Sequence, residues 1–190
     1  TADVLSKDAI IVSASKGLEQ ETYLTVSQVL KQILPKALHK NLSVLIRAFE
    51  SMTSGAKLVL VGKDDFFYQR LRKQVEVSPK TQDILFFGHA SDRALANLYR
   101  YARALVFPSL MEGFGLPALE ALSFGTPVVA SDIPVFRETL GDDGIYFPTN
   151  EHSVLTRHLE DLVIHPVRLS KEKIEKWLSR FNWHALARST

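Results

Sequence analysis

The sequence of 190 residues contains no cysteine. This absence excludes disulfide scaffolds, cysteine-based zinc sites and thiol nucleophiles, and it fits a reducing compartment. Long hydrophobic runs are also missing, since runs such as 58–61 fall far short of the roughly 18 residues that span a bilayer. We therefore expect a cytoplasmic protein, either free or at the inner face of the membrane.

Neither sign of charge dominates: 23 Lys and Arg stand against 21 Asp and Glu, for a formal charge of +2. The basic residues are spread out and interleaved with acids, so no nucleic-acid partner is expected. The chain also lacks an initiator methionine, and we expect it to be a piece of a longer protein.

What the sequence does have is a regular alternation of apolar patterns. Buried strands are predicted at 23–26, 57–61, 84–87, 104–107, 127–130 and 145–147. Helical spacing separates them at 42–52, 67–75, 95–102, 117–124 and 136–140, and the rest is predicted to be helical with a break near Pro166. Strand–helix alternation with short connections predicts an α/β fold, a Rossmann-like doubly wound parallel sheet.

The predicted organisation has three parts. Residues 1–21 are expected to be the remnant of an interdomain connection, 22–166 the Rossmann-like domain, and 167–190 a C-terminal helix. Ile174, Trp177, Leu178 and Phe181 recur at helical spacing in this last segment. We expect this stripe to pack on a core or on an N-terminal lobe that this sequence lacks, with peripheral contact to an anionic membrane as the alternative.

The most informative stretch runs from Pro108 to Ala121. A strand leads into Gly113 and Gly115, and Pro117 follows where a first helical position is expected. The first amides of a helix have no partner within it, and the helix dipole adds positive charge, so this loop is predicted to bind a phosphate. The glycines would let the phosphate approach the backbone.

Two carboxylates frame this predicted anion site, Glu112 in the loop and Glu120 about one turn into the helix. A carboxylate beside a phosphate is repulsive unless it has another task, and two oxygens suit a vicinal diol. A diphosphate at the helix, a ribose on one carboxylate and a hexose on the other describe a nucleotide sugar. A single early glutamate would only complement the helix dipole, so the joint pattern carries this interpretation.

Residues 112–121 resemble the E-x7-E signature of family 4 retaining GT-B glycosyltransferases. The resemblance extends through 57–62, 86–88, 125–131, 134–138 and 181–183, elements of the donor-binding half of such enzymes. It implies that Glu112 contacts the donor sugar, Glu120 binds the ribose and Lys40 pairs with the diphosphate. The remaining implied nucleotide-sugar contacts are Gly62, Gly88, His89, Ala90, Gly113, Phe114, Gly115 and Leu116.

The resemblance further implies a retaining hexosyl transfer to a glycan or lipid-linked acceptor, without a metal or other cofactor. The acceptor would be bound mainly by a lobe that this sequence lacks, so the isolated chain is expected to be nearly inactive. One departure concerns the family's Gly-Arg after the first strand. Gln28 stands near the arginine position, and the irregular segment 29–40 offers Lys36 or His39 as substitutes.

Two alternatives stay open at this point. A dinucleotide-dependent oxidoreductase would use Gly113-Phe-Gly115-Leu-Pro-Ala118 as a G-x-G-x-x-A fingerprint, with Asp132 on the ribose. The late position of this motif in the strand order and the two flanking carboxylates oppose it. A non-catalytic nucleotide-sugar-binding module is the other alternative, suggested by Gln28 and segment 29–40.

Overall fold

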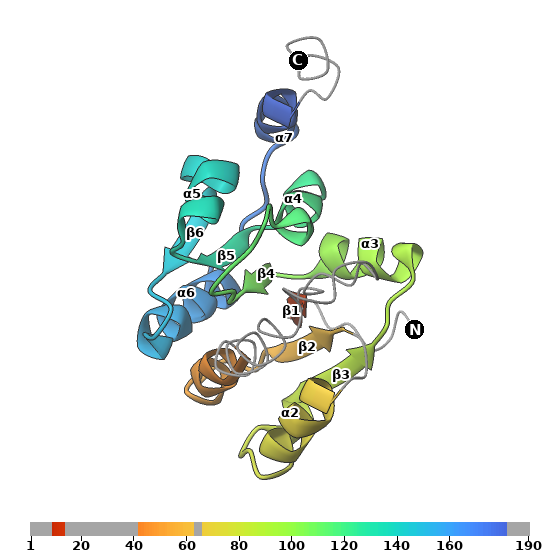
Figure 1. Ribbon diagram of the computed structural model, residues 1–190, viewed down its shortest axis with the longest axis vertical. Helices are drawn as coiled ribbons and strands as arrows, with labels where there is room; N and C mark the ends of the chain where they lie inside the picture. Colours follow the sequence, from red (N-terminus) through yellow and green to blue (C-terminus); the bar gives the residue numbers. More distant parts are fainter. Residues whose placement is uncertain (1–8, 14–41, 63–65, 182–190) are drawn as a thin grey trace, which may run out of the picture.

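The computed structural model describes residues 9–13, 42–62 and 66–181 (Figure 1). The strands are β1 Ala9–Ser13, β2 Lys57–Val61, β3 Ile84–Gly88, β4 Ala104–Phe107, β5 Val128–Ser131 and β6 Gly144–Phe147. The helices are one at residues 42–50, then α2 Phe66–Glu76, α3 Asp92–Tyr101, α4 Leu116–Ser123, α5 Pro134–Leu140, α6 His152–Ile164 and α7 Lys171–Leu178. Short 3-10 turns lie at Thr81–Asp83, Gly141–Asp143 and Ser179–Phe181.

The strands form one sheet in the order β3-β2-β1-β4-β5-β6, and all its pairings are parallel. This is the order of the Rossmann fold, in which the chain reverses direction across the sheet between β1 and β4. Ligands of such folds bind outside the carboxyl ends of the strands at that reversal. The segment that follows β4 therefore lies where a ligand is expected.

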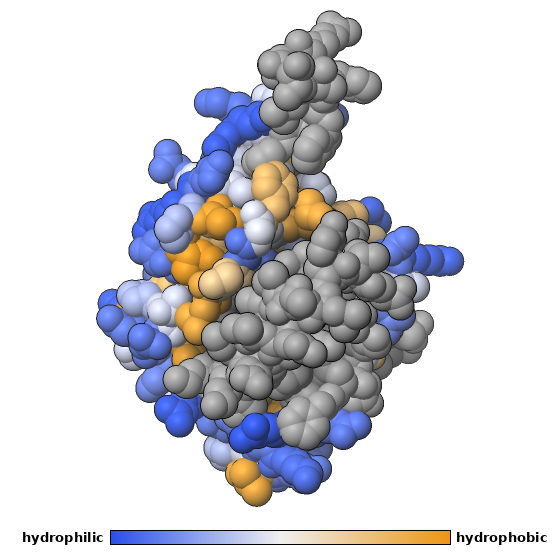
Figure 2. Space-filling view, in the orientation of Figure 1, coloured by the Kyte–Doolittle hydropathy of each residue, from blue (hydrophilic) through white to orange (hydrophobic). Residues whose placement is uncertain are grey.

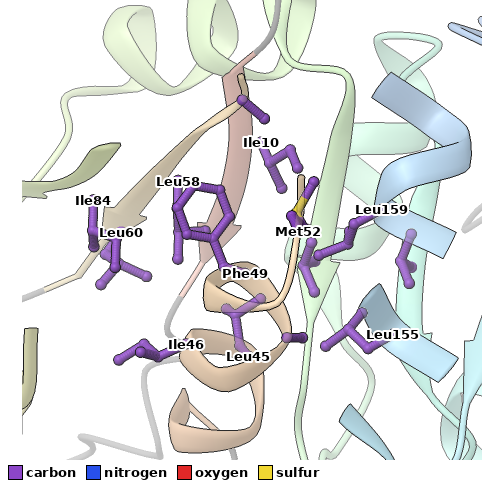
Figure 3. Packing of buried hydrophobic residues seen from close by; sticks show 14 of the residues in the cluster. Ile10, Leu45, Ile46, Phe49, Met52, Leu58, Leu60, Ile84, Leu155 and Leu159 are labelled. Atoms are coloured by element: carbon purple, nitrogen blue, oxygen red, sulfur yellow. The ribbon is translucent and has the colours of Figure 1, made fainter. Parts of the chain in front are cut away.

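Helices cover both faces of the sheet, so the strands are apolar on both sides. Along β2, Leu58 and Leu60 belong to one core cluster, whereas Val59 and Val61 belong to the other. Figure 3 shows the first cluster, in which Phe49 and Leu45 from the helix at 42–50 meet the sheet beside Leu159 from α6. Burying one such side chain contributes about 1.5–3 kcal/mol.

The second cluster lies on the opposite face, between the sheet and helices α3, α4, α5 and α7. In Figure 1, α3 and α4 lie above the strands, and α2 and α6 lie below them. Because α3 and α4 share a face of the sheet and follow β3 and β4, they place their side chains around the same edge. This arrangement positions the candidate site.

The structure confirms the α/β class and the predicted elements from β2 to α7, with boundaries shifted by a few residues. Ser91 caps α3 as expected, since its side chain accepts a hydrogen bond from the Ala94 amide. Trp177 of α7 is 2% exposed and belongs to the second core cluster, whereas Leu178 is 44% exposed. The C-terminal stripe thus packs on its own lobe through Trp177.

The central strand differs from the prediction. The stretch 23–26, predicted as the first strand, lies outside the described residues. Residues 9–13, expected to belong to an interdomain connection, form β1 between β2 and β4 instead. The β-branched run Ile10-Ile11-Val12 favours a strand, and Ile10 is 1% exposed in the first core cluster.

Candidate functional site

The loop between β4 and α4 is built around Gly115, the N-cap residue of α4. Its φ of 80° lies in the left-handed region that favours glycine. Space also requires glycine, because a Cβ at this position would lie 2.7 Å from Cε1 of the buried Phe136. Phe136 in turn packs on Phe107, with their ring centroids 4.9 Å apart. The loop therefore lies directly on an aromatic pair before it turns into the helix.

Helix α4 begins at Leu116, one residue before the predicted start, so Pro117 takes its second rather than its first position. The first helical hydrogen bond runs from the Ala118 amide to the Gly115 carbonyl over 2.9 Å. The amides before it belong to the set that a helix leaves without partners of its own, and they are the donors that bind anions at such positions. The start of α4 thus lies at the sheet reversal, where the sequence predicts an anion site.

Glu112 lies half-buried in the loop, and a neighbouring hydroxyl orients it. Oγ of Ser109 donates to Oε1 of Glu112 over 2.7 Å and also lies 3.1 Å from the Met111 carbonyl oxygen. Ser109 is 5% exposed, so the donor of this hydrogen bond is buried. Ser109 thereby orients the Glu112 carboxylate at the predicted anion site.

Glu120 is exposed on α4, and one of its oxygens is held by α3. The hydroxyl of Tyr99 donates to Oε2 of Glu120 over 3.1 Å. Burial of the phenol, and then the nearby Glu120 carboxylate, raise the pKa of Tyr99 above its ordinary value of 10.0. Tyr99 therefore stays protonated and remains a hydrogen-bond donor.

The ends of β2 and β3 carry the residues expected to meet the base. The Gly62 amide donates to the Gly88 carbonyl over 3.0 Å, and Gly88 has a φ of 74°. Pairing of the two strands skips Phe87, so Val61 lies opposite Gly88. The hydroxyl of Tyr68 accepts from the Gly88 amide over 2.8 Å and lies 3.2 Å from the Leu60 carbonyl oxygen. This turn is thus held from both strands.

The structure gathers most of the predicted site residues along the carboxyl edge of the sheet. Gly113, Leu116 and His89 are exposed, whereas Phe114 and Ala90 are half-buried. Lys40, expected to pair with the diphosphate, lies outside the described residues, as do Gln28, Lys36 and His39. Sequence reasoning missed the roles of Tyr68, Tyr99 and Ser109, because each of them looks like a core or loop residue in the sequence.

An apolar rim borders the loop. Leu110, Met111 and Leu116 are 37%, 73% and 56% exposed. Figure 2 shows apolar side chains in orange gathered over the region of β5 and α4. Exposed apolar groups of this kind are typical of a surface that meets another body.

Asp132, the ribose carboxylate of the oxidoreductase alternative, is already engaged. Its two oxygens accept from Nε and Nη2 of Arg137 over 2.7 and 2.8 Å. The hydrogen bond from Arg137 lowers the pKa of Asp132. The guanidinium also lies 3.8 Å from the centroid of the Tyr146 ring, which fixes it further. This arrangement gives Asp132 a structural partner.

Among residues 9–13, 42–62 and 66–181, no cluster of three or more His, Asp or Glu side chains could hold a metal ion. In the same part of the chain, no helix is both long enough and apolar enough to cross a membrane.

The sequence has clear relatives. O-antigen chain mannosyltransferase RfbU of Salmonella typhimurium is 31% identical over 145 residues, which make up 76% of this chain and 38% of that protein. O-antigen chain mannosyltransferase B of Escherichia coli is 34% identical over 128 residues, 63% of this chain and 32% of that protein. The chain thus spans well under half the length of these curated relatives.

Solved structures share the fold. Sucrose-phosphate synthase of Thermosynechococcus elongatus matches 99% of this chain and 45% of its own, with a TM-score of 0.75 and 24% identity. HepE of Anabaena, solved in complex with UDP and glucose, matches 99% of this chain and 48% of its own, with a TM-score of 0.74 and 16% identity.

The family itself follows from the sequence over most of the chain. Residues 16–177 match the family described as Glycosyl transferases group 1. The matched range contains the loop between β4 and α4, the carboxylates Glu112 and Glu120, and the turn at Gly88. The chain therefore belongs to the group 1 glycosyl transferases, as a Rossmann-like glycosyltransferase domain.

Proposed function

We propose that this chain is the donor-binding lobe of a retaining glycosyltransferase and binds a nucleoside-diphosphate hexose. The observation that carries the proposal is the placement of Glu112 and Glu120 on either side of the first turn of α4, at the sheet reversal. Each carboxylate already has a hydroxyl on one oxygen, so the other oxygen is available to a diol of the ligand.

The donor would lie along the carboxyl edge of the sheet. The amides of Phe114, Gly115 and Leu116 would hold the distal phosphate, with Glu120 on the ribose and Glu112 on the sugar hydroxyls. The backbone of Gly88-His89-Ala90, next to Gly62, would meet the base. Lys40 would supply the cation that pairs with the diphosphate.

The reaction would break the bond between the anomeric carbon and the diphosphate oxygen. The acceptor oxygen would form the new bond on the same face of the sugar, and its proton would pass to the departing diphosphate. Negative charge grows on that diphosphate in the transition state, where the α4 amides and Lys40 stabilise it. We propose that this stabilisation needs no metal, and unchanged nucleotide binding in excess EDTA is the expected result.

The acceptor would be bound by a second lobe. The chain covers 38% of RfbU, and the exposed rim formed by Leu110, Met111 and Leu116 offers that lobe a surface. The names of the relatives favour mannose as the sugar and a glycan or lipid-linked glycan as the acceptor. This chain alone should transfer little sugar.

We also propose a cytoplasmic location, supported by the lack of cysteine. Any peripheral contact with an anionic membrane would involve the exposed lysines of α7, Lys171, Lys173 and Lys176. Flotation with vesicles of anionic and neutral lipid would test this contact, and equal recovery with both would argue against it.

Calorimetric titration with UDP, GDP and NAD tests the function. We expect one of the nucleoside diphosphates to bind more tightly than NAD, and Glu120→Gln to weaken that binding. Equal or tighter binding of NAD, unaffected by Glu120→Gln, would favour a dinucleotide site and contradict the proposal.

A further inference from the structure

We propose that Tyr99 is a positioning residue that orients Glu120 to recognise the ribose diol of the donor nucleotide, so that the pair sets selectivity for ribonucleotides. The inference rests on the proposed function, since it assumes that Glu120 meets the ribose. Tyr99 lies on α3, whereas Glu120 lies on α4. Tyr99 would therefore act on the ligand only through the Glu120 carboxylate.

Tyr99 and Glu120 are joined by a direct hydrogen bond between their side chains. Tyr99 is 1% exposed, and its hydroxyl lies 3.1 Å from Oε2 of Glu120. An ionised carboxylate only accepts hydrogen bonds, so the phenol must donate. Oε2 is therefore occupied from the protein side, while Oε1 remains for a hydroxyl of the ligand. The carboxylate presents one defined face to the site.

Glu120 is an exposed glutamate, which would otherwise move among several rotamers. Fixing such a side chain at the moment of binding costs conformational entropy. A hydrogen bond formed before the ligand arrives removes part of that cost, which is the usual benefit of preorganisation. Tyr99 can do this only if its own position is fixed.

Tyr99 is itself held in place by contacts of its ring and of its main-chain carbonyl. Its ring packs on Phe124, with centroids 6.0 Å apart. Its main-chain carbonyl accepts hydrogen bonds from Oγ1 of Thr126 and, over 3.4 Å, from Nη1 of Arg168. Phe124 and Thr126 follow α4, the helix that carries Glu120. Tyr99 is thus tied to the C-terminal end of the helix whose carboxylate it orients.

Arg168 strengthens this attachment. Its guanidinium also donates to the Arg100 and Ala102 carbonyls over 2.5 and 2.7 Å and to Oγ1 of Thr126 over 2.6 Å. These contacts close the C-terminal end of α3 immediately beyond Tyr99. The phenol hydroxyl therefore lies at a fixed point relative to α4, as a positioning role requires.

The test compares two ligands that differ only in the diol. We first choose whichever of UDP and GDP binds more tightly. That nucleotide and its 2′,3′-dideoxy analogue are then titrated separately into the full chain. The readout is the ratio of the two dissociation constants. We expect a preference of about tenfold for the ribonucleotide, as a charge-assisted hydrogen bond to a hydroxyl gives. Tyr99→Phe should lower that ratio at least threefold and leave the affinity for inorganic pyrophosphate unchanged.

Tyr101→Phe is the matched control, because Tyr101 lies on the same helix and is 57% exposed. It should leave the ratio unchanged. If Tyr99→Phe keeps the wild-type ratio, or weakens nucleotides and pyrophosphate equally while lowering the melting temperature, the inference is overturned.

Glu120→Gln distinguishes failure of the positioning role of Tyr99 from failure of the ribose role of Glu120. If it abolishes the ribonucleotide preference while Tyr99→Phe does not, the positioning role fails and the proposed function stands. If neither nucleoside diphosphate binds, or the wild type has no ribonucleotide preference, the ribose role of Glu120 fails and the inference fails with it.

Discussion

Oγ of Ser109 lies 2.7 Å from Oε1 of Glu112, at the point where the chain leaves β4. A serine that is 5% exposed thus orients the carboxylate proposed to meet the donor sugar. The arrangement parallels that of Tyr99 and Glu120. Each framing carboxylate accepts a hydrogen bond from a protein hydroxyl on one of its two oxygens.

Replacing Ser109 by alanine should therefore weaken recognition of the sugar more than recognition of the nucleotide. We expect the gain in affinity from nucleoside diphosphate to nucleoside-diphosphate hexose to fall about fivefold, roughly 1 kcal/mol. Ser179→Ala removes an exposed hydroxyl bonded to the Lys176 carbonyl and serves as the control. Equal losses for both ligands in Ser109→Ala would contradict a role directed at the sugar.

Gly115→Ala should destabilise the lobe. A side chain at φ 80° is strained, and its Cβ would lie 2.7 Å from the Phe136 ring. Together these effects should cost about 2–4 kcal/mol in urea unfolding. Gly113→Ala is the matched control, because a Cβ there meets nothing within 4 Å, and it should cost less than about 0.5 kcal/mol. Similar losses in both variants would show that the loop does not lie on Phe136.

Arg168→Ala should also lower the free energy of unfolding, by about 2 kcal/mol, because it leaves carbonyls at the end of α3 without their charged donor. Arg157→Ala, which removes an exposed arginine from α6, should change stability by no more than about 0.5 kcal/mol. Denaturant unfolding of the three proteins compares them directly. If Arg168→Ala lowers the free energy of unfolding no more than Arg157→Ala does, the hydrogen bonds of Arg168 do not stabilise the end of α3.

Acid should weaken a contact on the opposite face of the lobe. Burial alone would raise the pKa of Glu160, but hydrogen bonds from Thr53 and Ser54 outweigh it and lower the pKa below the ordinary 4.5. A lowered pKa in the folded state means that the stabilisation is complete above pH 4.5 and is lost as the pH falls through the folded value. The stability difference between wild type and Glu160→Gln should therefore shrink below pH 4.5.

Urea unfolding of both proteins at neutral and at acid pH gives this difference. Thr81→Ala, an exposed threonine on the turn before β3, serves as a control whose stability difference from wild type stays constant with pH. A Glu160→Gln difference that is equally constant would show that the Glu160 carboxylate does not carry the effect.

Most of the fold follows from local patterns in the sequence. Strands β2 to β6 are short apolar runs that end at glycine, proline or polar residues, and the two core clusters show why they are apolar on both faces. The position of β1 did not follow, because 9–13 and 23–26 are both short apolar runs and periodicity does not rank them. Only the pairing of Ile10 with Leu58 and Ala104 identifies the central strand.

Part of the candidate site can likewise be predicted from the sequence, and part of it cannot. The loop between β4 and α4 is contiguous, so Gly113, Gly115 and both glutamates can be recognised from their spacing. Tyr99 and Glu120 lie 21 positions apart, and a buried tyrosine at helical spacing looks like any other core residue. Such contacts depend on how α3 packs against α4, which a single sequence does not encode in a short pattern.

The central claim is that the first turn of α4 binds the diphosphate of a nucleotide. Amide NMR of the ¹⁵N-labelled chain, titrated with UDP or GDP, tests it most directly. We predict that the largest shifts fall on the amides of Phe114, Gly115 and Leu116. The amide signals of Gly55 and Gly141, which precede β2 and β6 near the amino ends of the strands, should not shift. Large shifts of these two signals, with Phe114 to Leu116 unchanged, would contradict the account.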